Sequence, residues 1–397
     1  MASDEHAFHG GQFFSAIGED FSHMARRSEV INADVLDAWY DPSPQVLDQI
    51  REHLPWLIKT SPPTHAEGLT KVISEVRGIP ESQIFTSPGT SAAMFLALPR
   101  LVSSGDTVTL LDPCYGEYPH LLERVIGCRI LRCELVDENN FRVDLDQFIS
   151  LASQSKLAVL VNPNSPTGVH LPLSNVKKIL ESIPDSTALW IDETYIDFVG
   201  QHESAESLLA QFPNLIISKS LSKFYSLSGL RVGYLAGRAE FISELNRLSP
   251  PWNVGMLGQL AAILAMRDPE YYESCRMKTI ELRESMRKEL GQMKGVQVFP
   301  SDANFLLFRL EKPLAEALVL ECQKAGLYLR NCDSLSERFR GHFVRTAVKG
   351  DEWMAASNFR LDAGEAPDQN TIMNFRSPFT HERIIEIIRA AWRNLNG

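Results

Sequence analysis

A lysine in a serine-rich segment has the most specific chemical context in this sequence. Lys223 lies within residues 218–234, with Ser220 three residues before it, Ser222 beside it and Arg231 eight residues after it. Hydroxyl groups and a planar guanidinium are suited to binding a phosphate dianion, and a lysine amine forms an imine with an aldehyde. The segment therefore predicts a phosphorylated aldehyde cofactor attached to Lys223. The alternative is a surface lysine in a serine-rich turn.

A carboxylate follows a second apolar stretch, where residues 187–191 predict a β-strand that ends at Asp192. Because a buried carboxylate needs a cationic partner, Asp192 is suited to pairing with a protonated pyridine nitrogen, which would keep that ring electron-poor. Tyr195 is placed to hydrogen-bond a hydroxyl of the same ring. The alternatives are an aspartate that caps the following helix and a tyrosine that packs as an ordinary aromatic side chain.

Three further turns carry groups that fit the same kind of ligand. Gly89 opens a predicted helix whose first residues, Thr90 and Ser91, offer N–H groups to a phosphate. Tyr115 follows a predicted strand and is suited to stacking on a flat ring, and residues 161–168 form a rigid Asn-Pro turn. Each turn alone is compatible with ordinary turn chemistry, so it is their combination that indicates a binding site.

The pattern of elements places these groups at one edge of a sheet. Short apolar runs bounded by Pro, Gly, Asn or Asp predict strands at residues 106–112, 157–162, 187–192 and 215–218. Amphipathic stretches between these runs predict helices, one of which is expected to be N-capped by Ser174. Alternating strands and helices indicate an α/β fold with a parallel sheet covered on both faces. In such sheets ligands bind at the carboxyl ends of the strands.

The C-terminal part predicts a second, smaller α/β unit. A helical pattern covers residues 256–293 with a break near Asp268-Pro269, followed by strands at 296–300 and 304–308 and a helix at 382–395. Residues 349–379 are polar and irregular and predict a flexible insertion. We therefore expect an N-terminal arm and substrate loop (1–45), a large cofactor-binding domain (46–255), and a linking helix with a small domain (256–397).

In their order along the chain, these motifs resemble fold-type I pyridoxal-5′-phosphate (PLP) enzymes, the aminotransferase class I/II superfamily. The resemblance covers nearly the whole chain and implies a mostly parallel seven-stranded sheet sandwiched by helices in the large domain. It implies that Lys223 binds PLP as a Schiff base and moves the proton at the substrate α-carbon. It also implies that Asp192 pairs with the pyridine nitrogen, that Tyr115 stacks on the ring, and that the phosphate is held by Ser220, Arg231 and the Thr90-Ser91 amides.

Within the superfamily the chain is most similar to histidinol-phosphate aminotransferases and threonine-phosphate decarboxylases. Its His9-Gly-Gly opening is similar to that of the decarboxylases, where the histidine helps to bind a substrate phosphate; residues 251–254, 303–306 and 327–332 also resemble this pair of families. The same resemblance implies that Arg345 binds the substrate α-carboxylate and that Arg330 faces the distal end of the substrate, such as a phosphate. For either arginine the alternative is a solvated surface charge.

The chain departs from the family pattern in three places. The family asparagine that contacts the ring hydroxyl is replaced by Ser165, so Asn164 or Ser165 is expected to substitute. Residues 60–68 lack the tyrosine that the family supplies from the neighbouring subunit, and His65 is either its replacement or an ordinary turn residue. The substrate loop, residues 31–42 with Asn32, carries three acidic residues, Asp34, Asp37 and Asp41; it indicates either a cationic substrate group or a solvated acidic turn.

Composition narrows the functional classes. A formal net charge of −11 over 397 residues argues against a nucleic-acid partner, and no apolar run approaches a membrane span. The six cysteines form no CxxC pair, and we expect no metal site. With no signal peptide recognised, a reduced cytoplasmic protein is the expectation. The resemblance adds a homodimer and a biosynthetic role.

We therefore expect a PLP-dependent aminotransferase that acts at the α-carbon of an amino acid substrate. Three alternatives stay open from the sequence. They are a decarboxylase of a phosphorylated hydroxy-amino acid, a β/γ-replacement or cyclising enzyme, and a non-catalytic PLP-binding protein.

Overall fold

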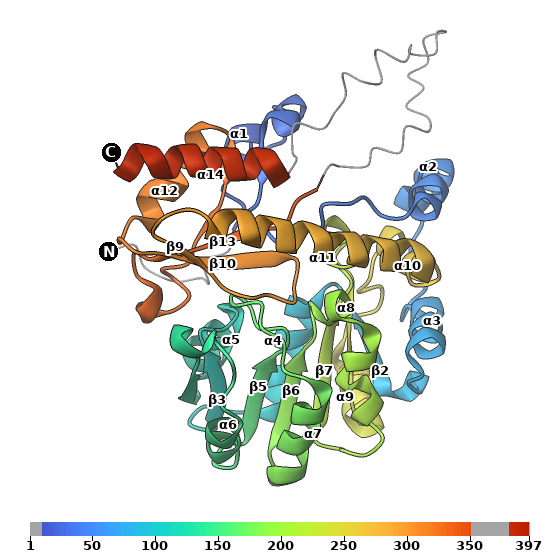
Figure 1. Cartoon of the computed structure of the whole chain (residues 1–397). Coiled ribbons are helices and arrows are strands. Elements are labelled where there is room, and N and C mark those ends of the chain that lie inside the picture. Colours follow the sequence, from blue (N-terminus) through green and yellow to red (C-terminus); the bar gives the residue numbers. More distant parts are fainter. Residues whose placement is uncertain (1–9, 351–380, 397) are drawn as a thin grey trace.

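A seven-stranded sheet forms the lower half of the molecule in the computed structural model, which describes residues 10–350 and 381–396 (Figure 1). Its spatial order is β2-β8-β7-β6-β5-β3-β4. The strands are β2 Ile84–Ser87, β3 Thr107–Asp112, β4 Arg129–Glu134, β5 Leu157–Val161, β6 Ala188–Asp192, β7 Leu215–Ser220 and β8 Gly233–Ala236. Strands β4, β3, β5, β6 and β7 pair in parallel, and β8 runs antiparallel to both β7 and β2. The mostly parallel seven-stranded sheet is thus confirmed.

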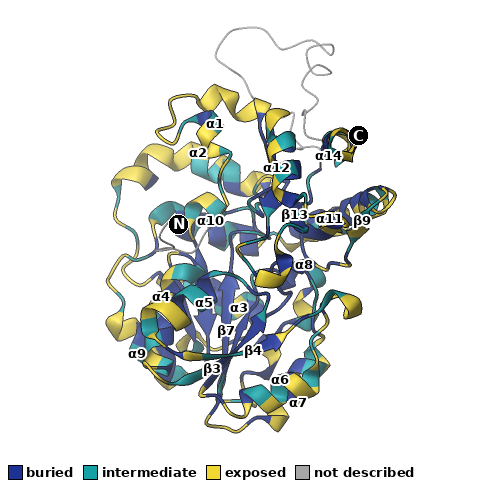
Figure 2. Cartoon of the chain, turned by 90° about the vertical axis from the view of Figure 1, so that its left-hand side faces the viewer, coloured by how far each residue is buried: buried dark blue, intermediate teal, exposed yellow. Residues whose placement is uncertain are grey.

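Helices cover this sheet and connect its strands. Helix α4 contacts β7 and β8, α6 contacts β3 and β4, and α9 contacts β2. The helices of the N-terminal and central parts are α1 Phe14–Ile17, α2 Pro44–Lys59, α3 Glu67–Arg77, α4 Thr90–Leu101, α5 Glu117–Pro119, α6 Leu145–Ala152, α7 Leu173–Ser182, α8 Ile196–Val199 and α9 Ala239–Leu248. In Figure 2 the strands are mostly buried while the outer faces of these helices are exposed, which is the layering expected of an α/β sheet.

A smaller α/β unit lies on the carboxyl edge of the large sheet. Its sheet has the order β12-β13-β10-β9, with β12 Arg330–Asn331, β13 Phe343–Ala347, β10 Phe305–Leu310 and β9 Val296–Val298. It carries α12 Ala315–Lys324 and α14 His381–Asn396, and α11, Pro269–Gly291, crosses the molecule above the large sheet (Figure 1). Strand β1, Ile31–Asn32, pairs in parallel with β11, Leu327–Tyr328. The N-terminal substrate loop is thereby attached to the small unit, whereas the predicted domain boundaries stay predictions.

The predicted helix break is confirmed, and one predicted cap is wrong. Helix α10 spans Met256–Met266 and α11 spans Pro269–Gly291. The Asp268 side chain accepts a hydrogen bond from the Tyr271 N–H, and Pro269 occupies the first turn, as both residue types favour. Ser174 does not cap α7. The helix begins one residue earlier, after Pro172, because proline fixes the backbone angle that a helix entry requires.

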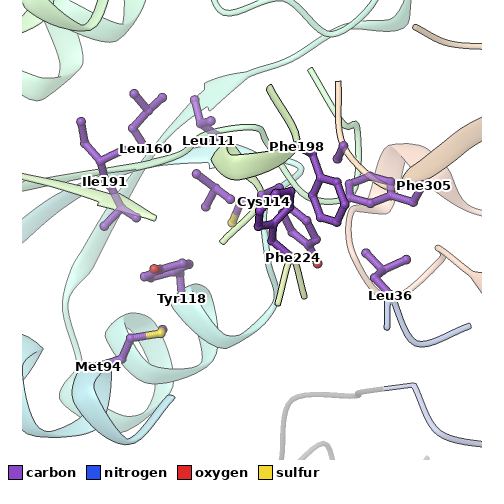
Figure 3. Packing of buried hydrophobic residues seen from close by; sticks show 14 of the residues in the cluster. Leu36, Met94, Leu111, Cys114, Tyr118, Leu160, Ile191, Phe198, Phe224 and Phe305 are labelled. Carbon is purple, nitrogen blue, oxygen red and sulfur yellow. The ribbon is translucent and has the colours of Figure 1, made fainter. Parts of the chain in front are cut away.

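Aromatic packing joins the two units beside the carboxyl edge. The Phe198 and Phe224 rings are 5.3 Å apart, and the Tyr195 and Phe305 rings are 5.2 Å apart, both edge to face. Figure 3 shows Phe198, Phe224 and Phe305 together with Leu36 of the N-terminal loop. Phe305 comes from the small sheet and the other three aromatic rings come from segments that follow strands of the large sheet. This apolar layer fixes the place where both sheets supply polar groups.

None of the helices within the described ranges is long and apolar enough to cross a bilayer. The predicted insertion at 349–379 lies almost wholly outside the described residues, apart from its first two.

Candidate active site

The strand-end groups singled out in the sequence share one edge of the large sheet. Strands β2, β3, β5, β6 and β7 run in the same direction, since β8 is antiparallel to both β2 and β7. Their carboxyl ends therefore lie along a single edge. The residues that follow these ends are Gly89, Tyr115, Asn164, Asp192 and Lys223. The sequence prediction that these groups converge agrees with this topology.

Arg231 lies against the glycine turn at the start of α4. Its Nη1 donates to the Ser228 carbonyl at 3.0 Å and to Ser222 Oγ at 3.4 Å. A Cβ atom at Gly89 would be 2.6 Å from Arg231 Nη2, and the φ of Gly89 is +84°. Glycine is therefore required here for the guanidinium to approach the backbone. Ser220, buried on β7, accepts a hydrogen bond from the Ser222 N–H at 3.2 Å.

The start of α4 has the free donors that a phosphate needs. No side chain caps this 12-residue helix, so the first-turn N–H groups, Thr90 and Ser91 among them, lack intrahelical partners. Two hydroxyls, those of Ser91 and Tyr115, share a hydrogen bond, while burial raises the pKa of Tyr115 to about 12. Hydroxyl, amide and guanidinium donors thus surround one end of the Tyr115 ring.

Asp192 is buried among neutral donors. Its Oδ2 accepts from the Tyr118 hydroxyl at 2.8 Å, and its Oδ1 accepts from the N–H and the hydroxyl of Thr194 at 2.9 and 2.6 Å. The bond to the Thr194 N–H is also the helix-capping arrangement weighed as the alternative. Burial raises the pKa of Asp192, so a cation beside the carboxylate would stabilise the ionised form.

Tyr118 is the partner of Asp192 that sequence reasoning missed. Its hydroxyl also accepts from the Trp190 Nε1–H at 2.9 Å, and Figure 3 shows its ring among the buried side chains near the sheet. The available signal was the spacing: Tyr118 follows Tyr115 by three residues, which in a helical turn places the two side chains on the same side. The rings of Tyr115 and Tyr118 are indeed edge to face at 6.1 Å.

Lys223 forms an ion pair with the substrate loop. Its Nζ lies 2.9 Å from Asp37 Oδ1. Asn32 Nδ2 is 3.5 Å from the other carboxylate oxygen of Asp37, and Lys349 Nζ donates to the Asp37 carbonyl at 3.0 Å. Two of the three acidic residues of this loop are not simply solvated, because Asp34 is only 2% exposed and Asp37 contacts the lysine of the strongest motif, whereas Asp41 is exposed. Sequence reasoning gave Asp37 no partner.

The Asn-Pro turn presents two polar side chains. Asn164 Nδ2 donates to the Pro113 carbonyl and to Thr167 Oγ1, whereas its buried Oδ1 has no partner within the described residues. Ser165 Oγ accepts from Arg345 Nη1 at 3.3 Å. Ser165 therefore contacts Arg345, which was predicted to bind the substrate, and Asn164 keeps one acceptor available for a ligand.

Two arginines lie side by side on adjacent strands of the small sheet. Arg330 and Arg345 are register partners on β12 and β13, so their side chains lie on the same face. Arg345 Nη2 donates to the Asp34 carbonyl at 3.2 Å, and its buried Nε has no partner in the described part of the chain. Burial and the charge of Arg345 lower the pKa of Arg330, which is 4% exposed and donates to Ser334. An anion between them would relieve this repulsion.

Tyr195 lies between the strand-end groups of the large sheet and Arg345 of the small sheet. Burial raises its pKa, with the neighbouring Arg345 charge opposing and the Tyr115, Asp192 and Asp37 groups adding to the effect. Its hydroxyl therefore stays protonated at neutral pH and can donate a hydrogen bond.

Of the two predicted histidines, the structure describes His65 alone. His65 is exposed just before α3, where its main-chain N–H donates to Glu67. His9 lies outside the described residues.

A buried charge network underlies the cluster and was not predicted. It consists of two cations and three carboxylates with side chains at most 9% exposed, namely Arg77, Lys219, Glu193, Asp197 and Glu206. Lys219 Nζ lies 3.1 Å from Glu193, 3.7 Å from Asp197 and 3.7 Å from Glu206. Glu193 follows Asp192 directly and Lys219 precedes Ser220 directly. The network therefore joins the carboxyl ends of β6 and β7, where Asp192 and Ser220 lie.

The described residues fit PLP in donor chemistry as well as in position. The Gly89 turn with Arg231 and the serine hydroxyls suits a phosphate, because the absence of a Cβ atom at Gly89 lets the guanidinium lie directly against the turn. Within the described residues the buried Asp192 carboxylate accepts hydrogen bonds from the neutral groups of Tyr118 and Thr194, which suits a protonated pyridine nitrogen as a further partner. Asn164 Oδ1 is a buried acceptor without a partner. No cluster of His, Cys, Asp and Glu in the described ranges is suited to holding a metal ion.

The fold and this site define a fold-type I PLP enzyme. The sequence model of the family "Aminotransferase class I and II" matches residues 32–352. A histidinol-phosphate aminotransferase of Clostridium acetobutylicum is 34% identical over 323 residues, covering 80% of this chain and 87% of the relative. The chain therefore belongs to the aminotransferase class I and II family and is a PLP-dependent aminotransferase.

Solved structures share the fold. The crystal structure of the histidinol-phosphate aminotransferase from Clostridium acetobutylicum superposes with a TM-score of 0.77 at 21% identity, covering 92% of this chain and 100% of that one. That of L-threonine-O-3-phosphate decarboxylase from Porphyromonas gingivalis gives a TM-score of 0.67 at 22% identity, covering 79% and 94%. At these identities the two structures establish the architecture.

Proposed function

We propose that the chain transfers the amino group of a small substrate that carries an anionic group at its distal end, such as a phosphorylated amine or amino acid. The supporting observation is the Arg330–Arg345 pair, a buried and a half-buried guanidinium in register on adjacent strands, in which the charge of Arg345 lowers the pKa of Arg330. Buried cations of the same sign are costly unless an anion lies between them. Phosphate and carboxylate both match the guanidinium fork.

The residues of the site would have separate roles in the reaction. When bound, PLP supplies an electron-withdrawing ring that stabilises negative charge at the substrate α-carbon. Asp192 would hold a proton at the ring nitrogen, and Tyr115 would stack on the ring. Asn164, Ser165 and Tyr195 would serve the ring hydroxyl, and the phosphate would be held by Gly89, Thr90, Ser91, Ser220, Ser222 and Arg231. Lys223 Nζ would move the proton at the α-carbon.

The substrate test compares one amine with and without its phosphate. With an α-keto acid as acceptor, we expect kcat/KM for histidinol phosphate to exceed that for histidinol by at least a hundredfold, since two charge-assisted contacts contribute about 3 kcal/mol or more. Arg330→Ala should remove most of that ratio, while Arg309→Ala, at an exposed ion pair with Asp137, should leave it unchanged. Equal kcat/KM values in the unmodified enzyme would refute an anionic distal group.

Decarboxylation is the second candidate, because the superposed Porphyromonas gingivalis enzyme is a decarboxylase of a phosphorylated amino acid. The same panel decides between them if L-threonine phosphate is included and carbon dioxide is measured. Release of carbon dioxide without keto-acid consumption would assign decarboxylation, and keto-acid consumption without release would assign amino transfer. Replacement or cyclisation would give neither signal.

The active form we propose is a cytoplasmic homodimer. Large apolar side chains are exposed on the single chain, namely Trp56 at 51%, Ile58 at 68%, Phe95 at 43% and Trp252 at 55%, and a second copy would remove them from water. His65 at the surface would then be available to the partner's site, together with Asn32 and His9 on the substrate side. All six cysteines are free and buried, as expected of a reduced compartment. Sedimentation of the active enzyme as a monomer would contradict the dimer.

A further inference from the structure

We infer that Asp37 is a catalytic residue: its carboxylate holds the proton at Lys223 Nζ, both when this nitrogen is a free ammonium and when it is bonded to the cofactor. The inference rests on the family assignment and on the placement of PLP at Lys223. It concerns the protonation of one atom and needs no substrate.

The first observation is the distance between the Asp37 carboxylate and the Lys223 amine. Asp37 Oδ1 lies 2.9 Å from Lys223 Nζ, a charge-assisted hydrogen bond. The two residues are 186 positions apart in the sequence, so the contact requires the N-terminal loop to reach the carboxyl edge of β7. Lys223 lies three residues past the end of β7, and its nitrogen is taken to keep this place when it bonds to an aldehyde carbon. The carboxylate therefore stays within reach of the same nitrogen.

Two other groups hold this carboxylate in place. Lys349 Nζ donates to the Asp37 carbonyl at 3.0 Å, and Asn32 Nδ2 is 3.5 Å from Asp37 Oδ2. These contacts come from β1 and from the segment after β13, so the position of Asp37 does not depend on Lys223 alone.

The charged and titratable groups around Asp37 favour its ionised form. Burial works to raise its pKa, but the charges of Lys223 and Lys349 and the hydrogen bond from Lys223 together hold the pKa below its usual value. Tyr195, which faces the loop from the end of β6, stays neutral because its own pKa is raised. Asp37 is therefore a fixed negative charge at neutral pH, and it favours a proton on the nitrogen beside it.

This arrangement has a chemical use. An imine carbon is attacked by an amine most readily when its nitrogen carries a proton, because the positive charge withdraws electrons from that carbon. A carboxylate at hydrogen-bond distance keeps that form populated at higher pH than a neutral neighbour would. The alternative is that Asp37 is only a counter-ion for the free lysine and has no effect on the protonation of Nζ once the cofactor is attached.

A substrate-free titration separates these alternatives. The protein is loaded with PLP, and the pH midpoint of its visible absorbance change is measured for the unmodified enzyme and for Asp37→Asn, Asp37→Glu and Asp41→Asn. Because a nearby opposite charge shifts a pKa by roughly 1–3 units and the Asp37 side chain is 34% exposed, we expect Asp37→Asn to lower the midpoint by about one unit. Asp37→Glu should restore most of the shift, and Asp41→Asn, in the same loop, should leave the midpoint unchanged.

Each outcome has a fixed meaning. An Asp37→Asn midpoint equal to that of the unmodified enzyme overturns the inference. If Asp37→Asn does not fold, Asp37→Ser is measured in its place with the same expectation. If both neutral variants fold with normal circular dichroism but take up no cofactor, Asp37 acts in attachment instead, and the inference is again overturned. Absence of any lysine-linked absorbance in the unmodified enzyme would refute the proposed function itself, which is a different result.

Discussion

Replacing Lys219 by methionine tests the buried charge network most directly. The Lys219 side chain is 1% exposed and its Nζ lies 3.1 Å from Glu193 and 3.7 Å from both Asp197 and Glu206. Methionine fills a similar volume without the charge, so the substitution removes the cation and little packing. Three buried carboxylates then share Arg77 as the one cation left in the network.

The expected loss of stability follows from this geometry. Removing one partner of a buried ion pair leaves an uncompensated charge and typically lowers the free energy of unfolding by about 3–5 kcal/mol. We expect the PLP-loaded Lys219→Met enzyme to fall in this range in urea denaturation near neutral pH. The matched control is Lys177→Met on α7, where Lys177 and Glu181 are 3.8 Å apart with side chains 47% and 56% exposed, and the loss should stay below about 1 kcal/mol.

The pH dependence gives an independent check. The neighbouring carboxylates raise the pKa of Lys219 in the folded state, so its stabilisation is complete at neutral pH and is lost only as the pH rises through that raised value. Burial raises the pKa of Glu193, and the Lys219 charge opposes this effect. Without the lysine, burial is opposed mainly by the hydrogen bonds from Ser204 and the Ala205 N–H, and Glu193 binds a proton more readily as the pH falls. The deficit of Lys219→Met should therefore shrink in weakly acidic buffer. A neutral-pH loss below about 1 kcal/mol, or a deficit independent of pH, would refute this reasoning.

Three other substitutions have defined outcomes. Tyr118→Phe removes the acceptor 2.9 Å from the buried Trp190 Nε1–H, and urea denaturation should show a loss of about 1–3 kcal/mol. Gly89→Ala places a Cβ atom 2.6 Å from Arg231 Nη2 at a φ of +84°, so the PLP dissociation constant, measured by equilibrium dialysis, should rise at least tenfold, about 1.4 kcal/mol. Arg345→Ala should raise KM for anionic substrates, by about 2–5 kcal/mol in binding if the lost contact is buried.

Controls for these variants are available in the chain. Gly78→Ala also has a positive φ, +70°, but a Cβ atom there meets nothing within 4 Å; it should cost stability without changing PLP affinity. A Gly89→Ala enzyme that binds PLP normally would contradict the phosphate assignment. For Arg345, an unchanged KM would mean that the substrate anion lies elsewhere, and for Tyr118 an unchanged urea midpoint would mean that water replaces the lost hydroxyl.

Residues near each other in sequence were the ones that could be predicted. Strands β3, β5, β6 and β7 were located by apolar runs, and the break before Pro269 by the cap that precedes it, because each signal is contained in a few consecutive residues. The strand-end groups Asp192 and Lys223 followed from the rule that parallel strands end at one edge.

Contacts between distant segments could not be predicted. The Asp37–Lys223 pair and the Arg77–Asp197 pair join positions 186 and 120 residues apart, and in a single sequence such charges have the same pattern as solvated ones. Arg77 at the end of amphipathic α3 is an example: its position predicts an exposed cation, yet its side chain is 1% exposed. Tyr118 was missed because one more aromatic residue after Tyr115 carries no signal of its partner.

The antiparallel strand β8 sets the order in which this enzyme can be completed during its synthesis. β8 lies between β2 and β7 in the sheet, and Gly233 on β8 pairs with both Ser87 and Ser220. The helix start beside Ser87 and the lysine segment beside Ser220 are therefore joined through residues 233–236. A nascent chain that has not yet released these residues from the ribosome lacks the strand that pairs with both segments. We therefore expect cofactor binding only after more than half of the polypeptide has emerged.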